Sequence, residues 1–317
     1  MKTGLVVAAM ILTASSVIAQ NPQTAQQSDS ARAANARNRG GGRCRSAPSD
    51  TTGNAYNCVD APNPLSAPAT VWLEEMTWMD VRDAIAAGKT TVIIPTGGME
   101  PNGPWLVTGK HNYVLQANCE AIARKLGNAL CAPIIKLVPE GNIERQTSHM
   151  ASPGTISLRE DTFRAMLTDV VHSLKMHGFK NIILIGDSGG NQPGQRYVAD
   201  SLTKIWNGNP VVAHIQQYYD YNKVSQQMGS KIVEGKSDNL HDDPIITLNM
   251  FITDPKSVRY EERVKANKAT INGFSIADRN KSLELAREIV AFRAEVTVDF
   301  INKSIANKGT LPPPPRP

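Results

Sequence analysis

The sequence predicts an α/β fold in which helices cover a parallel or mixed β-sheet. From Val71 onward, segments with helical periodicity alternate with short apolar runs that are typical of buried strands. The chain has 317 residues, of which 41% are hydrophobic and 20% are charged, enough for one large or two modest globular domains. This composition excludes a disordered, collagen-like or coiled-coil protein. With 5% aromatic residues, 23 Gly and 20 Pro, an α/β domain with tight turns is favoured over an aromatic-rich β-sandwich.

The segments that flank this domain, residues 71–308, have a different character. Residues 1–19 combine an early positive charge, an apolar run over residues 5–12 and small residues before a cleavage site near Ala19, as a secretory signal does. The apolar run is too short for a permanent span, so we expect no stable membrane insertion and a periplasmic or secreted protein. Residues 20–70 indicate a flexible leader rich in Arg, Gly, Pro and Ser, and residues 309–317 a Pro-rich tail.

The net charge of +5 is concentrated outside the folded domain. The leader holds five Arg against three Asp, and Lys2 lies in the signal segment, so the domain itself is only slightly positive. A weakly charged body is not typical of a nucleic-acid-binding protein, and we expect no nucleic-acid partner.

Four cysteines allow three disulfide pairings in an oxidising compartment. The favoured pair is Cys44–Cys58, which would close a small loop before the domain. Cys119 falls on an expected helix and Cys131 at the start of an expected strand, and both are interpreted as buried thiols.

The pattern along the domain predicts each element in turn. A Ser157–Glu160 capping box is predicted to open a helix that Gly178 closes, and Gly127 is predicted to end the helix before it. The predicted strands are 91–95, 132–138, 181–185 and 211–215. The predicted helices are 112–126, the helix that follows the Ser157 cap and runs to about residue 177, and 281 to about 305.

Two of these strands run into glycine-rich turns that carry an acid, at residues 97–100 (GGME) and 186–190 (GDSGG). Such turns often only connect strands to helices, but ligand sites in open α/β sheets lie beyond the carboxyl ends of the strands. The coincidence of two such turns favours a functional site there. GDSGG also occurs in trypsin-like proteases, but Ser188 follows a helix and a buried strand rather than part of a β-barrel, and lipases require Gly-x-Ser-x-Gly.

The residue types at this edge predict a metal site. Glu100, His111 and Asp187 offer two carboxylates and one imidazole, a set suited to one divalent zinc, manganese or iron ion. His241 and Asp243 are the predicted catalytic residues, which move a proton to the leaving group. The remaining histidines are interpreted as surface or hydrogen-bonded structural residues: His149, His172, His177 and His214.

Neighbouring residues are candidates for substrate contact. Trp105 would wall the pocket or pack in the core, Ser188 would contact substrate or only shape its turn, and Asn191 would present a backbone N–H at a helix start. The full predicted substrate-binding set is Asn102, Trp105, Ser188, Gly189, Gly190 and Asn191.

Several motifs extend this interpretation: WLEEMTW at 72–78, IPTGGMEPNGP at 94–104, PGTIS at 153–157, HGFKNII at 177–183 and GGN at 189–191. In order and spacing, residues 71–263 resemble the creatininase family of metal-dependent amidohydrolases. The resemblance implies a three-layer α/β/α fold with a mostly parallel central sheet, a homo-oligomer, usually a hexamer, and a one- or two-metal centre. Such a centre activates water against a small-molecule amide, lactam or formamide.

The ligand motifs depart from the family pattern, which resembles Glu-x-His-Gly-Pro-His followed by an Asp. Glu100 is kept, Asn102 and Trp105 stand at the histidine positions, and His111 stands at the Asp position. In the later motif Ser188 replaces a ligand His beside Asp187. The resemblance therefore implies one metal per subunit on Glu100, His111 and Asp187. The alternative is a catalytically decayed binding or scaffold protein with this fold.

Overall fold

The computed structural model describes residues 59–310. The predicted signal (1–19), most of the predicted leader, the Cys44–Cys58 pair and the end of the predicted tail lie outside the described residues. Contacts divide the chain into the units Met1–Pro64 and Leu65–Pro317, and the second is described below.

The core of this unit is a four-stranded parallel sheet in the order β2-β1-β3-β4. The strands are β1 (Thr91–Thr96), β2 (Ala129–Cys131), β3 (Asn181–Gly186) and β4 (Val211–His214). The three strand pairings join apolar runs whose side chains are buried on both faces of the sheet. Such burial is expected where helices cover both faces. The predicted α/β class with a mostly parallel sheet is confirmed.

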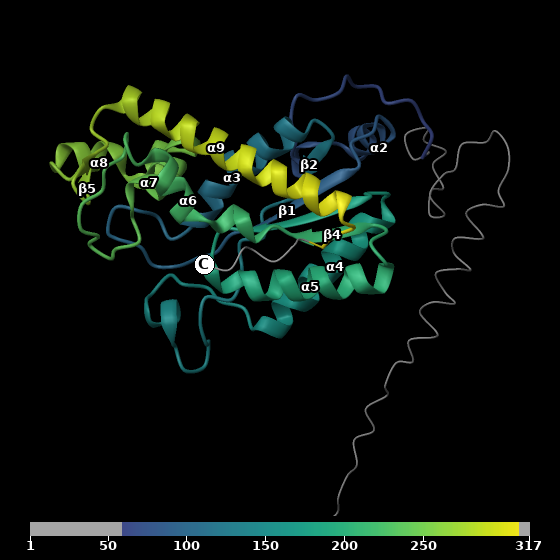
Figure 1. The fold of residues 1–317 in the computed structure, drawn as a ribbon, viewed down its shortest axis with the longest axis horizontal. Helices are drawn as coiled ribbons and strands as arrows, with labels where there is room; N and C mark the ends of the chain where they lie inside the picture. The colour runs from purple at the N-terminus through teal and green to yellow at the C-terminus, as the bar shows by residue number, and fades with distance from the viewer. Residues whose placement is uncertain (1–58, 311–317) are drawn as a thin grey trace, which may run out of the picture. The chain divides into compact units, whose positions relative to one another are not determined.

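Alternate side chains of the strands face two helical layers. Ile93 and Ile183 pack against α3 (Lys110–Leu126) and α9 (Arg279–Ala306), whereas Ile94 and Leu184 pack against α4 and α5. Helix α4 spans Glu160–Met176 and α5 spans Gln192–Trp206. Figure 1 shows the sheet between these two helix pairs, which makes the predicted α/β/α architecture.

Additional elements pack beside this sandwich. Helices α6 (Tyr221–Met228), α7 (Pro244–Thr253) and α8 (Tyr260–Lys265), with the hairpin β5 (Thr270–Ile271) and β6 (Phe274–Ser275), form a second apolar core against α9. Near the start of the unit, Thr77 and Asp80 form a capping box that opens α2 (Trp78–Ala86). Across residues 59–310, no helix is both long and apolar enough for a membrane span.

Two local predictions were wrong. The strand expected at 132–138 lies earlier, at β2, because Pro133 cannot donate to the ladder; beyond it only isolated bridges form, such as that between Ile135 and Thr96. The capping box expected at Ser157 is absent, since the Ser157 hydroxyl instead accepts from Glu140 N and donates to Gly141 O, both at 2.8 Å. Helix α4 begins at Glu160 without a side-chain cap.

Cys119 and Cys131 form a disulfide and are not buried thiols as expected. Helix α3 packs on the sheet beside β2, which brings the two Cα atoms to 6.4 Å, within the range of a disulfide. Both residues are fully buried in the core between α3, α9 and the sheet.

Candidate metal centre

The candidate site is a polar pocket of about 370 Å³ where the carboxyl ends of β1 and β3 meet the start of α3. Glu100 follows β1, Asp187 follows β3, and Lys110 and His111 are the first two residues of α3. These four side chains line the pocket together with Ser188, Gly189, Gly190, His149, Tyr219, Tyr221, His241, Asp243 and Ile246.

Glu100 lies at the centre of the site and is almost fully buried. One carboxylate oxygen, Oε1, lies 2.6 Å from Lys110 Nζ, and the other, Oε2, lies 3.1 Å from His111 Nε2 and 3.2 Å from His149 Nδ1. Burial alone would raise the pKa of Glu100, but its contact with His111 and the charges of His111 and Lys110 hold this pKa well below its usual range. Glu100 is therefore an anion at neutral pH.

His111 lies between two carboxylates. Its Nδ1 is 2.9 Å from Asp187 Oδ2, while Nε2 faces Glu100. Burial would lower the pKa of His111, but the contacts with Asp187 and Glu100 outweigh burial and raise it. Both ring nitrogens of His111 thus face carboxylates.

Asp187 is fixed from its other side by Arg293 of α9. Arg293 Nη2 donates to Asp187 Oδ1 at 2.9 Å, and the buried guanidinium lies between the rings of Tyr218 and Tyr221, at 4.3 and 4.6 Å from their centres. The Tyr221 hydroxyl also donates to Asp187. Burial would raise the pKa of Asp187, but the charge of Arg293 and the contact with His111 lower it.

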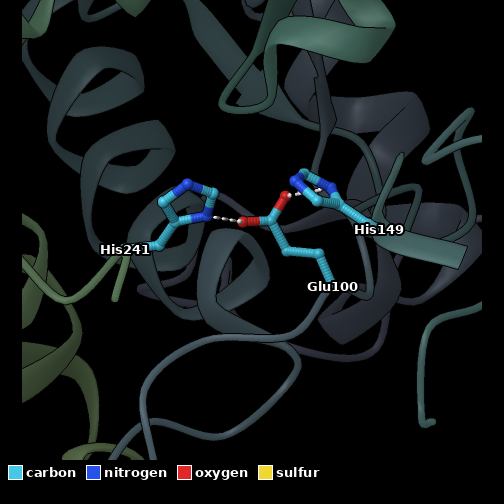
Figure 2. A group of neighbouring side chains, drawn as sticks. All are labelled: Glu100, His149 and His241. Carbon is cyan, nitrogen blue, oxygen red and sulfur yellow. Dashed lines mark ion pairs between the residues drawn. The ribbon is translucent and has the colours of Figure 1, made fainter. Parts of the chain in front are cut away.

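The other histidines of the pocket face Glu100. Figure 2 shows His149 and His241 on opposite sides of its carboxylate; His241 Nδ1 lies 3.8 Å from Oε1. His149 Nδ1 also lies 3.1 Å from Oε2 of Glu140, whose other oxygen, Oε1, is buried and has no hydrogen-bond partner among residues 59–310. Burial, followed by the charge of Glu100, raises the pKa of Glu140. Burial, followed by the charge of Lys110, lowers the pKa of His241, which is thus a neutral imidazole at pH 7.

Glu100, His149 and His241 fit a divalent metal. One donor atom from each lies within 4.8 Å of the other two. Two imidazoles and one carboxylate are ligands that zinc, manganese and iron accept, and three protein ligands leave coordination positions for water and substrate. The unpaired oxygen of Glu140, beside His149, adds an acceptor whose burial is costly without a positive partner.

The chain segment that carries His241 is held firmly. Gly103 N donates to Leu240 O at 2.7 Å, and Asp242 forms a buried ion pair with Arg263 at 3.0 Å. His241 itself has a φ of 57°, in the left-handed region that residues with a Cβ rarely adopt. Such backbone strain persists where the surrounding contacts enforce it, and it is common at functional sites.

The structure brings the three predicted ligands together: His111 lies between Glu100 and Asp187 and contacts both. Their contacts with one another are those of an ion-pair chain, and their assignment as a ligand set stays a prediction. The two predicted catalytic residues, His241 and Asp243, both line the pocket.

The predicted substrate-binding residues divide into two groups. Ser188, Gly189 and Gly190 line the pocket, whereas Asn102, Trp105 and Asn191 are not among its lining residues. The Asn102 amide donates to Glu100 O and Val107 O, each at 3.2 Å. The fully buried Asn191 amide donates to Thr96 O and Gly97 O, each at 3.1 Å. These two amides shape the turn that follows β1.

Three site residues were not singled out in the sequence, namely Lys110, Glu140 and Arg293, and a fourth, His149, was interpreted only as a surface or structural residue. One signal was present for the first of them. Lys110 and His111 open α3, whose first turn contains no acid, although helix N-termini favour negative charge. His149 and Glu140 lie in the irregular segment between β2 and α4, and Arg293 lies on a long helix, where a charged residue is usually solvated.

The family model for creatinine amidohydrolase matches residues 74–299. The chain belongs to the creatininase family. Among curated proteins, a creatinine amidohydrolase of Pseudomonas putida is 27% identical over 135 residues, 42% of this chain and 49% of that protein. A 3-dehydro-scyllo-inosose hydrolase of Thermotoga maritima is 24% identical over 159 residues, 49% of this chain and 47% of that protein. The chain thus matches about half the length of these two relatives.

Solved creatininases share the fold. A structure described as creatininase Mn aligns with a TM-score of 0.56 and 21% identity over 73% of this chain and 99% of its own. Another creatinine amidohydrolase aligns with a TM-score of 0.53 and 21% identity over 78% of this chain and 100% of its own. These likenesses confirm the creatininase-like three-layer fold.

Proposed function

We propose that this protein is a metal-dependent hydrolase that attacks an amide C–N bond of a small molecule, with one divalent metal held by Glu100, His149 and His241. The observation that carries the proposal is the two-histidine, one-carboxylate set in a pocket at the carboxyl edge of the creatininase-family sheet. The creatinine amidohydrolase and the manganese and zinc forms among the relatives support an amide substrate and a metal of this kind.

When bound, a divalent metal supplies a Lewis acid for the carbonyl group and a water of lowered pKa. The chain's own groups do the rest. Glu100, an anion, and His241, a neutral imidazole, have the protonation states that ligands require. Lys110 and His111 contact Glu100, and Glu140 contacts His149, so these three residues orient the two ligands.

Proton transfer is assigned to Asp243. Its carboxylate lines the pocket two residues after His241, and Oδ1 accepts from Asn272 Nδ2 at 3.3 Å. Asp243 would take the proton of the attacking water and deliver it to the leaving nitrogen. The Tyr219 hydroxyl adds a donor to the same pocket: burial, followed by the charges of Asp187 and Glu100, raises the pKa of Tyr219 to about 12, so it stays protonated.

Metal analysis of purified protein tests the ligand set. We expect about one equivalent of zinc, manganese or iron in the wild type. Metal affinity should fall by more than about 100-fold in Glu100→Gln, His149→Ala and His241→Ala, because each removes one of three ligands. His177→Ala, at an exposed position of the same residue type, is the matched control and should bind as the wild type does.

The variants His111→Ala and Asp187→Asn separate this set from the one expected from the sequence. Metal that survives in His149→Ala and His241→Ala but disappears in His111→Ala would overturn the proposed set in favour of Glu100, His111 and Asp187. A wild type that takes up no divalent metal would favour the second candidate, a binding or scaffold protein with a hydrolase fold. The ion pair between Lys110 and Glu100, which neutralises Glu100 without a metal, favours that candidate.

A further inference from the structure

Lys110 is placed against the ordinary preferences of a fold. It is the first residue of α3, where the helix dipole disfavours a cation. The Lys110 side chain is only 4% exposed, so its charge is also largely removed from water. Stability alone does not account for a buried cation at this end of a helix.

The ammonium of Lys110 is incompletely used. Within the described part of the chain, Glu100 is its one ion-pair partner, through Oε1 at 2.6 Å. An ammonium has three N–H donors, so one contact leaves two for other acceptors. Lys110 lines the 370 Å³ pocket beside His241 and Asp243, and a ligand in that pocket can therefore reach it.

A second positive group in the pocket would assist the metal in the hydrolysis of an amide. Residues 59–310 contain one cluster of three donors suited to a metal, and its carboxylate is Glu100. Lys110 Nζ contacts Oε1 of that carboxylate, the oxygen that His241 Nδ1 also faces, so Glu100 is both a proposed metal ligand and the partner of a fixed protein cation. Attack on an amide carbonyl builds negative charge on its oxygen, and a cation already in place stabilises that charge without rearrangement.

We infer that Lys110 is a substrate-binding and catalytic residue whose ammonium receives the carbonyl oxygen of the amide, beside the metal held by Glu100, His149 and His241. The inference rests on the proposed function for the identity of the reaction. Lys110 forms no covalent bond; it donates hydrogen bonds to the oxygen as charge develops. The substrate class is thus an amide whose carbonyl oxygen enters the pocket toward α3.

The test measures binding of methylphosphonate, a tetrahedral oxyanion, to the zinc-loaded chain by calorimetry. Lys110→Met should weaken binding at least tenfold, about 1.4 kcal/mol, because it removes the charge and the donors but keeps the length of the side chain. Lys110→Arg should retain most of the affinity. Lys125→Met, an exposed lysine on the same helix, is the matched control and should match the wild type.

Zinc affinity is measured in parallel, since Lys110→Met should bind zinc as tightly as the wild type or more tightly. If Lys110→Met and Lys125→Met bind methylphosphonate equally, or if Lys110→Met loses zinc, the inference is wrong and Lys110 only supports Glu100. Lys110→Gln replaces the methionine variant if the latter does not fold.

Failure of the proposed function gives a different result. A wild type that binds no zinc would refute the metal site, and the same titration is then made on the metal-free protein, whose Lys110 lies at the same pocket wall. Weaker methylphosphonate binding in Lys110→Met than in Lys125→Met would still support the role of Lys110. Equal binding, or none in the wild type, would overturn it.

Discussion

At the scale of single residues, His214 couples pH to the shape of the site. Its ring lies at the end of β4, 2.8 Å from Gln192 Oε1, and the Gln192 amide donates to Gly186 O and Ser188 O at 2.9 Å. His214 thereby supports the turn after β3. Burial, followed by the charge of Arg196, lowers the pKa of His214 from 6.5 to about 4.

This shift predicts a loss of stability in acid. Between pH 6.5 and about 4 the unfolded chain binds a proton at His214 and the folded chain does not, so the contribution of His214 is intact above pH 6.5 and falls as pH drops. The full loss is on the order of 2–3 kcal/mol. Denaturant unfolding from pH 7.5 to 4.5 measures it, and His214→Gln should flatten the slope.

His177→Gln, at an exposed site, is the control for that experiment and should keep the slope of the wild type. Other groups also titrate in this range, and the difference between the two variants isolates His214. An unchanged slope in His214→Gln would contradict the assignment.

At the scale of elements, α9 reaches from the second apolar core to the site. Ile289 packs in the former, and one turn later Arg293 contacts Asp187. We expect Arg293→Met to lower the free energy of unfolding by about 3–5 kcal/mol, because it leaves the buried Asp187 carboxylate without its strongest partner. Arg293→Lys should cost less, since it keeps the charge but loses the contact to Tyr218 O.

Denaturant titration compares these variants with Arg287→Met, an exposed arginine of the same helix. Surface substitutions of that kind change stability by about 0.5 kcal/mol or less. Equal stability of Arg293→Met and Arg287→Met would show that the Asp187–Arg293 pair contributes nothing to folding.

The elements also show what the sequence could predict. The bounds predicted for β1, β3 and α9 differ from the observed bounds by no more than two residues. Each of these segments carries an uninterrupted hydrophobic pattern that is typical of its strand or helix. The predicted position of β2 was wrong, because a strand of three residues is too short to show a hydrophobic pattern and a proline follows it closely. Serine is a residue type that often caps a helix, but the Ser157 hydroxyl forms hydrogen bonds with Glu140 N and Gly141 O instead.

The candidate site was predictable to the extent that it depends on strand ends. Glu100, Asp187 and the glycine turn at 188–190 follow β1 and β3 directly, so parallel pairing alone brings them to one edge. His149, Glu140 and Arg293 come from an irregular segment and from a helix that returns from the second core, and local pattern carries no information on where such side chains meet. The raised pKa of His111 follows from its two carboxylate neighbours, which the sequence does not place beside it.

At the scale of the whole molecule, the Cys119–Cys131 disulfide joins two layers of the sandwich, α3 and the edge strand β2. Disulfides persist in oxidising compartments, which supports the proposed periplasmic or secreted location. The bridge closes a loop between residues separated by 12 positions. A loop of that length restricts the unfolded chain by about 3 kcal/mol in the chain-entropy model.

We therefore expect reductant to lower the free energy of unfolding of the wild type by about 3 kcal/mol, measured by equilibrium denaturation with and without a phosphine reductant. The matched control is the double variant Cys119→Ala and Cys131→Ala, which keeps Cys44 and Cys58, so any effect of reducing those residues persists in it. The difference between the two reductant effects belongs to the bridge between α3 and β2. If both proteins respond equally, the bridge does not stabilise the domain, and the contact between these two layers depends on the apolar core alone.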